Sequence, residues 1–385
     1  MIIAIDGYEA NVGNRVGIGR YAYELLRNLY ILGQKAVNNK QHLQFRIYLP
    51  EKPRGDMPKE TYWWQYRITK PKKLWTMVGL PMRLFTDQPR ADVMFSPTHY
   101  IPRFTTIPRV MAIMDLSYLS YPELFRKKDL HQLIHWTRHS VMYAKKIFTI
   151  SDFSKNAIIQ AYKRAPDDVI VTHPGLIMNT TNGEQNIQSI VEKYHISKHY
   201  ILSVGTIQPR KNYVRLIEAF SRFLGKNKQK FGTIDLVIVG KKGWLYEEIL
   251  KAPELYGVGD RVKFLNFVPD EDLPVLYKHA LCFALPSLYE GFGLPVLEAM
   301  AESCPVVVSH SSSLPEIAGK AGIYVNPEDT DSITNGLLAA VRERNLMQGR
   351  LRIKKGLEHI KKFTWEHAAE ETLRVLKEVG KEKSI

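Results

Sequence analysis

Short apolar runs alternate along the whole chain with segments whose apolar residues recur at helical spacing. Such alternation is typical of layered α/β proteins with parallel sheets. In the first half, strands are expected at Ile2–Ile5, Phe45–Leu49, Val93–Ser96, Arg109–Ile113 and Lys146–Ile150. In the second half, they are expected at Tyr200–Val204, Asp235–Val239, Val262–Phe264, Leu281–Leu285 and Pro305–Ser309.

Helices are expected between these strands, and turn residues suggest where the domains divide. The expected helices are Gly19–Leu32, Ser151–Tyr162, Val214–Leu224, Glu271–Lys278, Pro295–Ala301 and Thr364–Val379. Ser151 and Asp270 are expected N-caps, because their side-chain oxygens can accept from backbone N–H groups of the first turn. The polar segment Gly175–Ser189 is interpreted as a linker, which predicts two doubly wound domains at 1–178 and 190–363.

The composition is that of a globular protein. With 385 residues, 45% hydrophobic and 24% charged, the chain is long enough for two or three domains. Cys282 and Cys304 lie in apolar stretches, so we interpret them as reduced, buried thiols of a cytoplasmic protein. No apolar stretch is long enough to span a bilayer.

The formal net charge of +15 leaves several partners open. An anionic membrane surface or a lipid diphosphate acceptor would suit it, and so would solubility alone. We expect no nucleic-acid partner, since no zinc spacing or RNA-recognition signature is present. The segment Tyr62–Arg83 mixes basic residues with Trp63, Trp64 and Trp75. It suits a membrane interface, single-stranded nucleic acid or packing inside a domain.

The run from Tyr289 to Met300 carries the most specific chemistry. Glu290 and Glu298 flank a glycine-rich turn that follows an apolar strand and leads into a helix. Free N–H groups and a helix N-terminus favour anions at such an edge, and Gly291 and Gly293 allow close approach of a ligand. Carboxylates beside an anion site suggest a phosphate flanked by hydroxyls, as in a nucleotide-sugar.

Two adjacent cations, Arg210 and Lys211, follow the strand Tyr200–Val204. Ligands of doubly wound sheets bind at the carboxyl ends of the strands. Arginine can hold two phosphate oxygens and lysine supplies a point charge, so this pair suits a diphosphate.

These motifs together resemble family 4 of the retaining glycosyltransferases, which have the GT-B fold. Glu290 to Glu298 resembles the family's E-x7-E motif, and the resemblance extends to the segments 17–21, 205–212, 305–309 and 314–319. It implies two Rossmann-like domains facing across a cleft, with the C-terminal helix 364–380 completing the N-terminal domain. Many members have Gly-Arg where this chain has Gly205-Thr206, so Arg210 and Lys211 would carry the positive charge.

The resemblance also implies roles for individual residues. Glu290 would face the donor sugar, Glu298 would bind the ribose, and Arg210 and Lys211 would stabilise the departing diphosphate. The implied donor-binding set is completed by Gly17, Gly19, Phe267, Val268, Gly291, Phe292, Gly293 and Leu294, with the base near Phe267 and Val268. In the loop that opens the first helix, Arg15 is a candidate for contact with a phosphate or the acceptor.

On the acceptor side the chain departs from its relatives, which often have His-Asp where this chain has Met114-Asp115. A thioether cannot take a proton, so any role of that histidine is in doubt. Asp115 could act on the acceptor hydroxyl as a base or orienting group, or could cap a turn. His99, also at a strand end, is a candidate substitute.

Two other patterns could indicate a metal, but we expect none. Asp270 and Asp272 resemble an Asp-x-Asp metal motif, although an acidic first helical turn explains them better. His131, His135 and His139 share a helix face without an acidic partner, which favours a solvated face.

The sequence therefore predicts a retaining hexosyltransferase without cofactor or metal, cytoplasmic or peripheral on the inner face of the cell membrane. GDP-mannose is the expected donor, with UDP-glucose or a dTDP-deoxysugar as alternatives. The expected acceptor is a glycan or lipid-linked oligosaccharide in polysaccharide assembly. A non-catalytic nucleotide-sugar or nucleic-acid binding protein is the remaining alternative.

Overall fold

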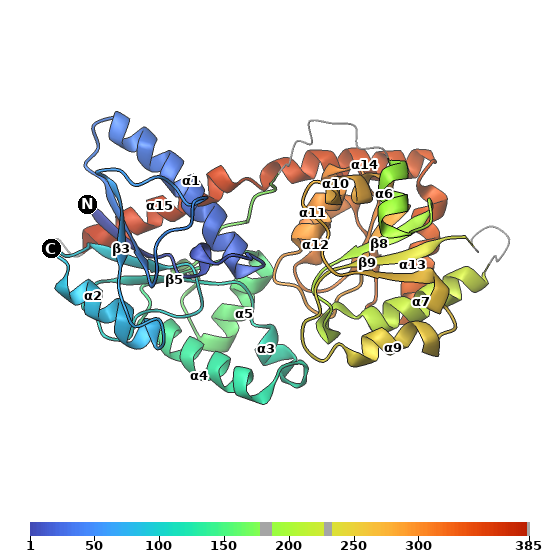
Figure 1. Ribbon diagram of the computed structural model, residues 1–385, viewed down its shortest axis with the longest axis horizontal. Helices are drawn as coiled ribbons and strands as arrows, with labels where there is room; N and C mark the ends of the chain where they lie inside the picture. Colours follow the sequence, from blue (N-terminus) through green and yellow to red (C-terminus); the bar gives the residue numbers. More distant parts are fainter. Residues whose placement is uncertain (178–186, 227–232, 383–385) are drawn as a thin grey trace. The chain divides into compact units, whose positions relative to one another are not determined.

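The computed structural model describes residues 1–177, 187–226 and 233–382 and divides into two compact units. The first unit comprises Met1–Ser120, Lys127–Gly175 and Phe363–Ile385, and the second comprises Tyr121–Arg126 and Leu176–Lys362. Each unit contains one parallel sheet covered by helices (Figure 1). The α/β class expected from the alternation of strands and helices is confirmed.

The first unit is built on a seven-stranded sheet with the order β3-β2-β1-β4-β5-β6-β7. Its central strands are almost wholly apolar and buried, as expected when helices cover both faces. The strands are β1 (Ile2–Asp6), β2 (Gln44–Leu49), β3 (Trp64–Ile68), β4 (Val93–Ser96), β5 (Arg109–Ile113), β6 (Lys146–Thr149) and β7 (Val169–Val171). The helices are α1 (Ile18–Asn38), α2 (Leu80–Thr86), α3 (Ser117–Ser120), α4 (Lys127–Tyr143), α5 (Asp152–Tyr162) and α15 (Trp365–Lys381).

The C-terminal helix α15 belongs to the first unit and lies along α1 (Figure 1). The rings of Tyr21 and Trp365 pack at 5.8 Å between centroids, and Lys35 Nζ lies 2.9 Å from Glu366 Oε1. Thr364 caps α15 by accepting from the N–H of His367. Gly175 packs so tightly against α15 that a Cβ there would lie 2.1 Å from the Trp365 nitrogen.

The second unit is built on a six-stranded sheet with the order β10-β9-β8-β11-β12-β13. Its strands are β8 (Tyr200–Val204), β9 (Asp235–Val239), β10 (Val262–Leu265), β11 (Cys282–Leu285), β12 (Val306–Ser309) and β13 (Ile323–Val325). Its helices are α6 (Ile187–Tyr194), α7 (Tyr213–Gly225), α9 (Glu247–Leu255), α10 (Leu273–His279), α11 (Leu294–Ala301), α12 (Leu314–Ala318), α13 (Thr330–Glu343) and α14 (Met347–His359). Aromatic side chains of α7, including the stacked pair Phe220 and Phe223, lie in its core.

Three strands were not expected, and one N-cap was assigned wrongly. β3, β7 and β13 are outer strands. In β3 only alternate residues are fully buried, and β7 and β13 are only three residues long, so each gives a weak pattern. Helix α10 begins at Leu273 and not at Glu271. Asp270 lies in the preceding turn, where Leu273 N–H donates to the Pro269 carbonyl, so Asp270 is not the N-cap.

The domain boundaries differ from the expected ones in one respect. The short segment Tyr121–Arg126 belongs to the second unit, although the chain on both sides of it belongs to the first. The expected boundaries at 178 and 364 lie close to the observed ones at 175 and 363. Most of the expected linker, residues 178–186, lies outside the described residues.

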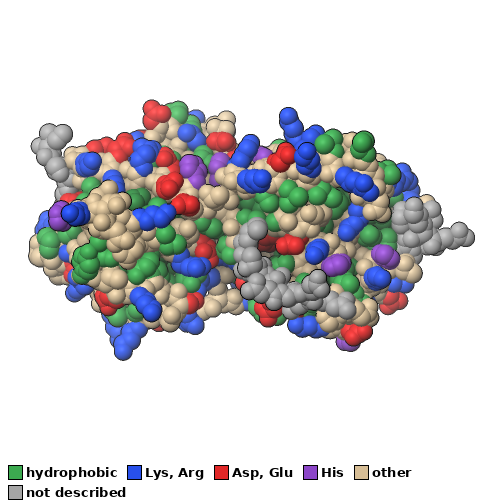
Figure 2. Space-filling model, turned by 90° about the horizontal axis from the view of Figure 1, so that it is seen from above, with side chains coloured by type: hydrophobic (Ala, Val, Ile, Leu, Met, Phe, Trp, Pro, Cys, Tyr) green, Lys and Arg blue, Asp and Glu red, His purple; other side chains and the backbone are tan. Residues whose placement is uncertain are grey.

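The segment Tyr62–Arg83 does not present its tryptophans to a membrane. Trp63, Trp64 and Trp75 are all buried in the first unit, where Trp63 and Trp64 pack around Phe45 and Tyr30. Their expected position at a lipid interface is therefore wrong. None of the described helices is both long and apolar enough to cross a membrane. Lysine and arginine side chains are exposed on both units (Figure 2). Cys282 and Cys304 are free and buried, as expected.

Candidate active site

Two loops of the second unit meet at the point where its strand order reverses. β8 lies next to β9 on one side and next to β11 on the other. In doubly wound sheets such a switch point opens a crevice outside the carboxyl ends of the two strands, where ligands bind. The loop after β8 contributes Arg210 and Lys211, and the loop after β11 contributes Glu290.

The charged side chains of these loops form one buried cluster. Lys211 Nζ lies 2.6 Å from Glu290 Oε1, and Arg210 Nη1 lies 3.3 Å from Glu290 Oε2. Burial opposes the ionised carboxylate, but the charges of Lys211 and Arg210 outweigh it and hold the pKa of Glu290 below its ordinary value. The cluster therefore pairs one carboxylate with two cations, which suits it to an anionic ligand.

Backbone contacts hold the two loops together beside this cluster. Arg210 Nη1 donates to the Tyr289 carbonyl at 2.6 Å, and Leu288 N–H donates to the Arg210 carbonyl at 2.9 Å. Asn212, in the left-handed conformation with φ of 61°, donates its side-chain amide to the carbonyls of Pro286 and Pro327. The position of Lys211 is thus set by a turn that is itself tied to the neighbouring loop.

Hydroxyl groups of two serines after β12 hold the backbone of Glu290 in place. Glu290 N–H donates to Ser312 Oγ at 3.1 Å, and Ser313 Oγ lies 2.9 Å from the Glu290 carbonyl and 2.8 Å from that of Phe292. These serines follow β12, and nothing in the sequence analysis pointed to them. A polar serine triplet directly after an apolar strand was the available signal.

The glycine-rich turn has the geometry that close approach requires. Gly293 has φ of +112°, a conformation that favours glycine. It immediately precedes α11, which begins at Leu294. Gly291 and Phe292 are buried beside it. Backbone groups of this turn and the first turn of α11 can therefore contribute to anion binding at the same edge as the cations.

Glu298, one helical turn into α11, has a partner that the sequence analysis missed. Tyr277 of α10 donates its hydroxyl to Glu298 Oε2 at 2.8 Å. Burial and then the negative charge of Glu298 raise the pKa of Tyr277 well above its ordinary value, so the hydroxyl keeps its proton. Tyr277 thereby orients a half-buried carboxylate, a group that can accept hydrogen bonds from hydroxyls.

The residues expected near the nucleotide base lie at the carboxyl end of β10. Phe267 is exposed, with Lys241 Nζ 5.7 Å from its ring centroid, whereas Val268 is buried. Lys241 follows β9, the neighbouring strand. Both residues therefore lie at the sheet edge that also holds the charged cluster.

The segment Tyr121–Arg126 packs against the loops of this site. Tyr121 contacts the Tyr289 ring at 6.1 Å between centroids, and its hydroxyl lies 3.4 Å from the Leu288 carbonyl. Trp244 donates its Nε1–H to the Leu124 carbonyl. The rings of Trp244 and Phe125 are in contact, with 5.7 Å between their centroids. The N-terminal half of the chain thus supports the Glu290 loop, which sequence order could not reveal.

In the first unit, Arg15 is engaged by protein groups. Its Nη2 donates to Asp56 Oδ1 at 2.9 Å, its Nε donates to the Ala10 carbonyl at 2.6 Å, and its guanidinium stacks 3.8 Å over the Tyr23 ring. The Cβ of an alanine in place of Gly19 would lie 3.1 Å from the Glu9 carbonyl, whereas Gly17 has φ of 51° and open space around it. Arg15 therefore holds its own loop in place. The expected contact with a phosphate would require Arg15 to give up its contacts with Asp56 and the Ala10 carbonyl.

His99 and Asp115 lie at the ends of the neighbouring strands β4 and β5 of the first unit. Asp115 Oδ1 accepts from the Ser117 N–H at 2.9 Å and from its hydroxyl at 2.6 Å, so Asp115 caps α3. His99 Nε2 accepts from the Met114 N–H at 3.3 Å. Burial lowers the pKa of His99, against the opposing charge of Asp115. The ring is thus held neutral next to the carboxylate.

Among the residues that the structure describes, potential metal ligands do not gather into a site within either unit. His131 and His135 form an exposed pair on α4, as expected for a solvated helix face, whereas His139 is partly buried and packs on Tyr143. Asp272 is buried and pairs with Lys193 at 2.6 Å, which removes it from a metal role.

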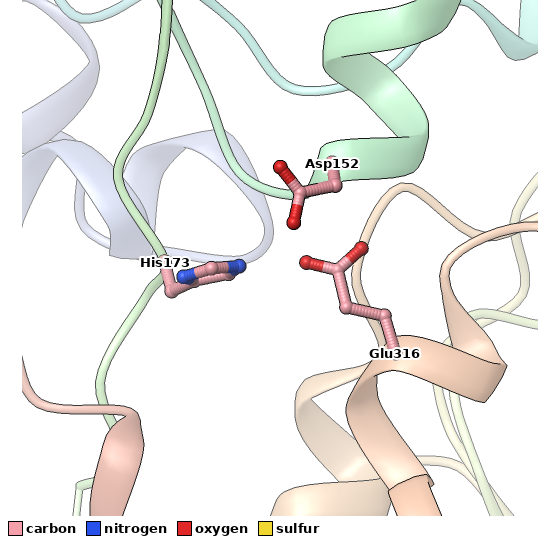
Figure 3. A group of neighbouring side chains, drawn as sticks. All are labelled: Asp152, His173 and Glu316. Atoms are coloured by element: carbon pink, nitrogen blue, oxygen red, sulfur yellow. The ribbon is translucent and has the colours of Figure 1, made fainter.

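Three further ionisable side chains are drawn in Figure 3. Asp152 in the first turn of α5 and His173 after β7 belong to the first unit, where His173 packs edge-on against Phe363 at 5.4 Å. Glu316, in α12, belongs to the second unit. Of these three described side chains, the first unit supplies two and the second unit one. A zinc site in a protein uses at least three protein ligands, so neither unit supplies enough of them by itself.

Comparison with known proteins identifies the family. Residues 186–356 match the family model described as glycosyl transferases group 1. The O-antigen chain mannosyltransferase B of Escherichia coli is 31% identical over 284 residues, which cover 73% of each chain. The serotype-specific mannosyltransferase WbdA of Escherichia coli is 32% identical over 226 residues, 56% of this chain and 26% of WbdA.

A solved structure shares the fold. The crystal structure of Anabaena HepE in complex with UDP-glucose aligns with a TM-score of 0.71 over 97% of this chain and 99% of that chain, at 17% identity. The chain therefore belongs to the group 1 glycosyltransferases. It is a sugar-transferring enzyme with the GT-B fold, as its motifs predicted.

Proposed function

We propose that this enzyme transfers mannose from GDP-mannose to a hydroxyl of a growing glycan, with retention of the anomeric configuration. The observation that carries the proposal is the buried cluster of Lys211, Arg210 and Glu290 at the switch point of the second sheet. Two cations there can receive a diphosphate, and the carboxylate between them can accept from sugar hydroxyls.

The proposed chemistry uses only groups of this chain. As the bond between sugar and diphosphate breaks, negative charge grows on the departing phosphate oxygens. Lys211 and Arg210, fixed by the loop contacts around them, would stabilise that charge without first having to reorganise. Glu298, held by Tyr277, would accept from the ribose hydroxyls. Because the cations serve the leaving group, the proposed reaction needs no metal.

The choice of donor is supported by the mannosyltransferase relatives in Escherichia coli. UDP-glucose is the second candidate, favoured by the complex of HepE, the structural neighbour. For the acceptor, the O-antigen chain named for the first relative supports a polysaccharide or a lipid-linked oligosaccharide in its assembly. Asp115 and His99 remain candidates for contact with the acceptor hydroxyl, because they lie together at the carboxyl ends of two strands.

A panel of nucleotides tests the donor. Thermal unfolding is measured with GDP, UDP, dTDP and ADP, because a ligand of the folded state raises the unfolding temperature. The proposal expects the largest rise with GDP, and transfer from GDP-mannose to a glycan acceptor that survives EDTA. A larger rise with UDP and transfer from UDP-glucose would favour the second candidate. Loss of activity on chelation, restored by manganese or magnesium, would contradict the metal-free reaction.

A further inference from the structure

The helical segment from Trp75 to Thr86, formed by the turn Trp75–Gly79 and α2, exposes apolar side chains although its inner face is already packed. Leu80 and Leu84 are buried in a core cluster with Tyr48 and Met94. On the outer side, Met82 and Phe85 are 60% and 71% exposed. Their spacing of three positions places them on one face of the helix. The segment is therefore apolar on two faces.

Two further exposed apolar residues lie next to this helical segment. Leu74, directly before the helical segment, is 57% exposed. Phe104 is 72% exposed and follows Arg103, whose N–H donates to the Thr76 carbonyl at 3.1 Å. We call Leu74, Met82, Phe85 and Phe104 the α2 face. Large exposed apolar side chains gathered in one place mark an interaction site more often than single ones do.

The stretch of chain that carries most of the α2 face is rich in basic residues. Residues 67–90 contain six basic residues and one acidic residue, Asp87. Asp87 is buried and neutralised by Arg67 and Arg83, at 3.5 Å and 2.9 Å. Among the described residues Lys70 and Lys73 form no ion pair, and both are exposed.

We propose that the α2 face is a docking surface for an anionic lipid bilayer. Apolar side chains would enter the boundary between headgroups and acyl chains, while Lys70 and Lys73 would face lipid phosphates. The charge of the surface selects this occupant, because a protein partner of ordinary composition would leave these ammonium groups without counter-charges. The buried Trp75 anchors the segment, since its Nε1 donates to Asp6 Oδ1 at 2.9 Å. The docking element is thus fixed to the first sheet.

Vesicle co-sedimentation with the full-length protein tests the proposal without any donor or acceptor. Phosphatidylglycerol and phosphatidylcholine vesicles are compared at low and high salt. We expect binding to phosphatidylglycerol only, weakening as salt rises because screening shortens the reach of the charges. The double variant Met82→Ser/Phe85→Ser should bind at least about tenfold more weakly. Lys70→Gln/Lys73→Gln should lose about tenfold as well.

Matched controls come from the second unit. Leu255→Ser/Met347→Ser removes two apolar side chains that are 74% and 87% exposed, and Lys361→Gln/Lys362→Gln removes two exposed lysines. Both should bind as the unmodified protein does. Unfolding temperatures of all variants verify folding.

Three results would overturn the proposal. The first is equal binding to both kinds of vesicle or to neither. The second is unchanged binding by the Met82→Ser/Phe85→Ser variant. The third is a dimer in solution that the same variant dissociates, because the α2 face would then be covered by a second copy.

Discussion

Lys211 and Glu290 form a buried ion pair, with Nζ 2.6 Å from Oε1, although 79 positions separate them in the chain. The pair exists because the strands before the two loops are neighbours at the switch point of the second sheet. Each partner compensates the burial of the other before a ligand arrives. A diphosphate could then share Lys211, and a sugar hydroxyl could share Glu290.

Glu290→Ala should reduce sugar transfer by at least about a hundredfold while GDP still binds. The reason is that Glu290 is expected to contact the donor sugar, close to the bond between sugar and diphosphate that breaks. The diphosphate itself is expected to be held by Arg210 and Lys211. Transfer rates and calorimetric titration with GDP measure the two effects separately. Glu248→Gln, an exposed carboxylate of α9 in the same unit, is the control. Full activity in a folded Glu290→Ala variant would refute the assignment.

Lys211→Ala and Arg210→Ala should each weaken binding of GDP by more than tenfold, and binding of guanosine much less. Only the diphosphate carries the charge that these side chains meet. Lys211→Ala also leaves the Glu290 carboxylate with fewer partners in a buried site, which costs about 1–3 kcal/mol of stability.

Titrations with GDP and guanosine are compared with those of Lys251→Ala, which removes an exposed lysine of α9. If the affinity for GDP is unchanged in both folded variants, the phosphate site lies elsewhere.

Tyr121→Ala should lower the rate of transfer by about three- to tenfold, because Tyr121 supports the loop that carries Glu290. An aromatic pair of this kind contributes about 0.5–1.5 kcal/mol. Tyr121→Phe keeps the ring and should be nearly fully active. Tyr62→Ala removes an exposed tyrosine of the first unit and should have no effect. Equal loss in Tyr121→Phe and Tyr121→Ala would show that ring packing is not the cause.

The parts of the fold that follow local patterns were predictable. β11 is a continuous apolar run, and β9 is one from Leu236 onward. Ser151 caps α5 by accepting from the Ser154 N–H, as its side chain allows. Outer strands gave weaker signals: β3 alternates, because its partly exposed residues Gln65 and Arg67 interrupt the apolar pattern. The tryptophans of Tyr62–Arg83 were misleading, because aromatic residues suit a lipid interface and a protein core equally well.

The candidate site was predictable where one motif carries it, and not where distant segments meet. Glu290, Arg210 and Lys211 lie at strand ends of a doubly wound sheet, so topology alone brings them near each other. Tyr277, Ser312 and Tyr121 come from three further segments, and no spacing rule connects them to Glu290. For Arg15 the expected phosphate contact stays a prediction, and in the structure its guanidinium donates to Asp56.

Asp6 should make the stability of the protein depend on pH, and replacing this one residue should reveal its share of that dependence. The side chain is buried at the end of β1. Burial raises its pKa to about 6 from an ordinary value of 3.8, against the hydrogen bonds from Tyr8 N–H and Trp75 Nε1. A carboxyl group with a higher pKa in the folded state holds its proton more tightly when folded. Its stabilising contribution is complete below about pH 3.8 and is lost as pH rises through about 6.

Asp6→Asn should therefore be more stable than the unmodified protein at about pH 7.5, by about 1–3 kcal/mol. Asparagine keeps the Oδ1 acceptor for Trp75 and Tyr8 but carries no charge to bury. The advantage should shrink toward zero as pH falls to about 4, where the protonated aspartate is also neutral. Denaturant unfolding at both pH values measures it, with Asp167→Asn, an exposed carboxylate of the same unit, as the control. A difference between Asp6→Asn and the unmodified protein that is the same at both pH values would contradict the raised pKa.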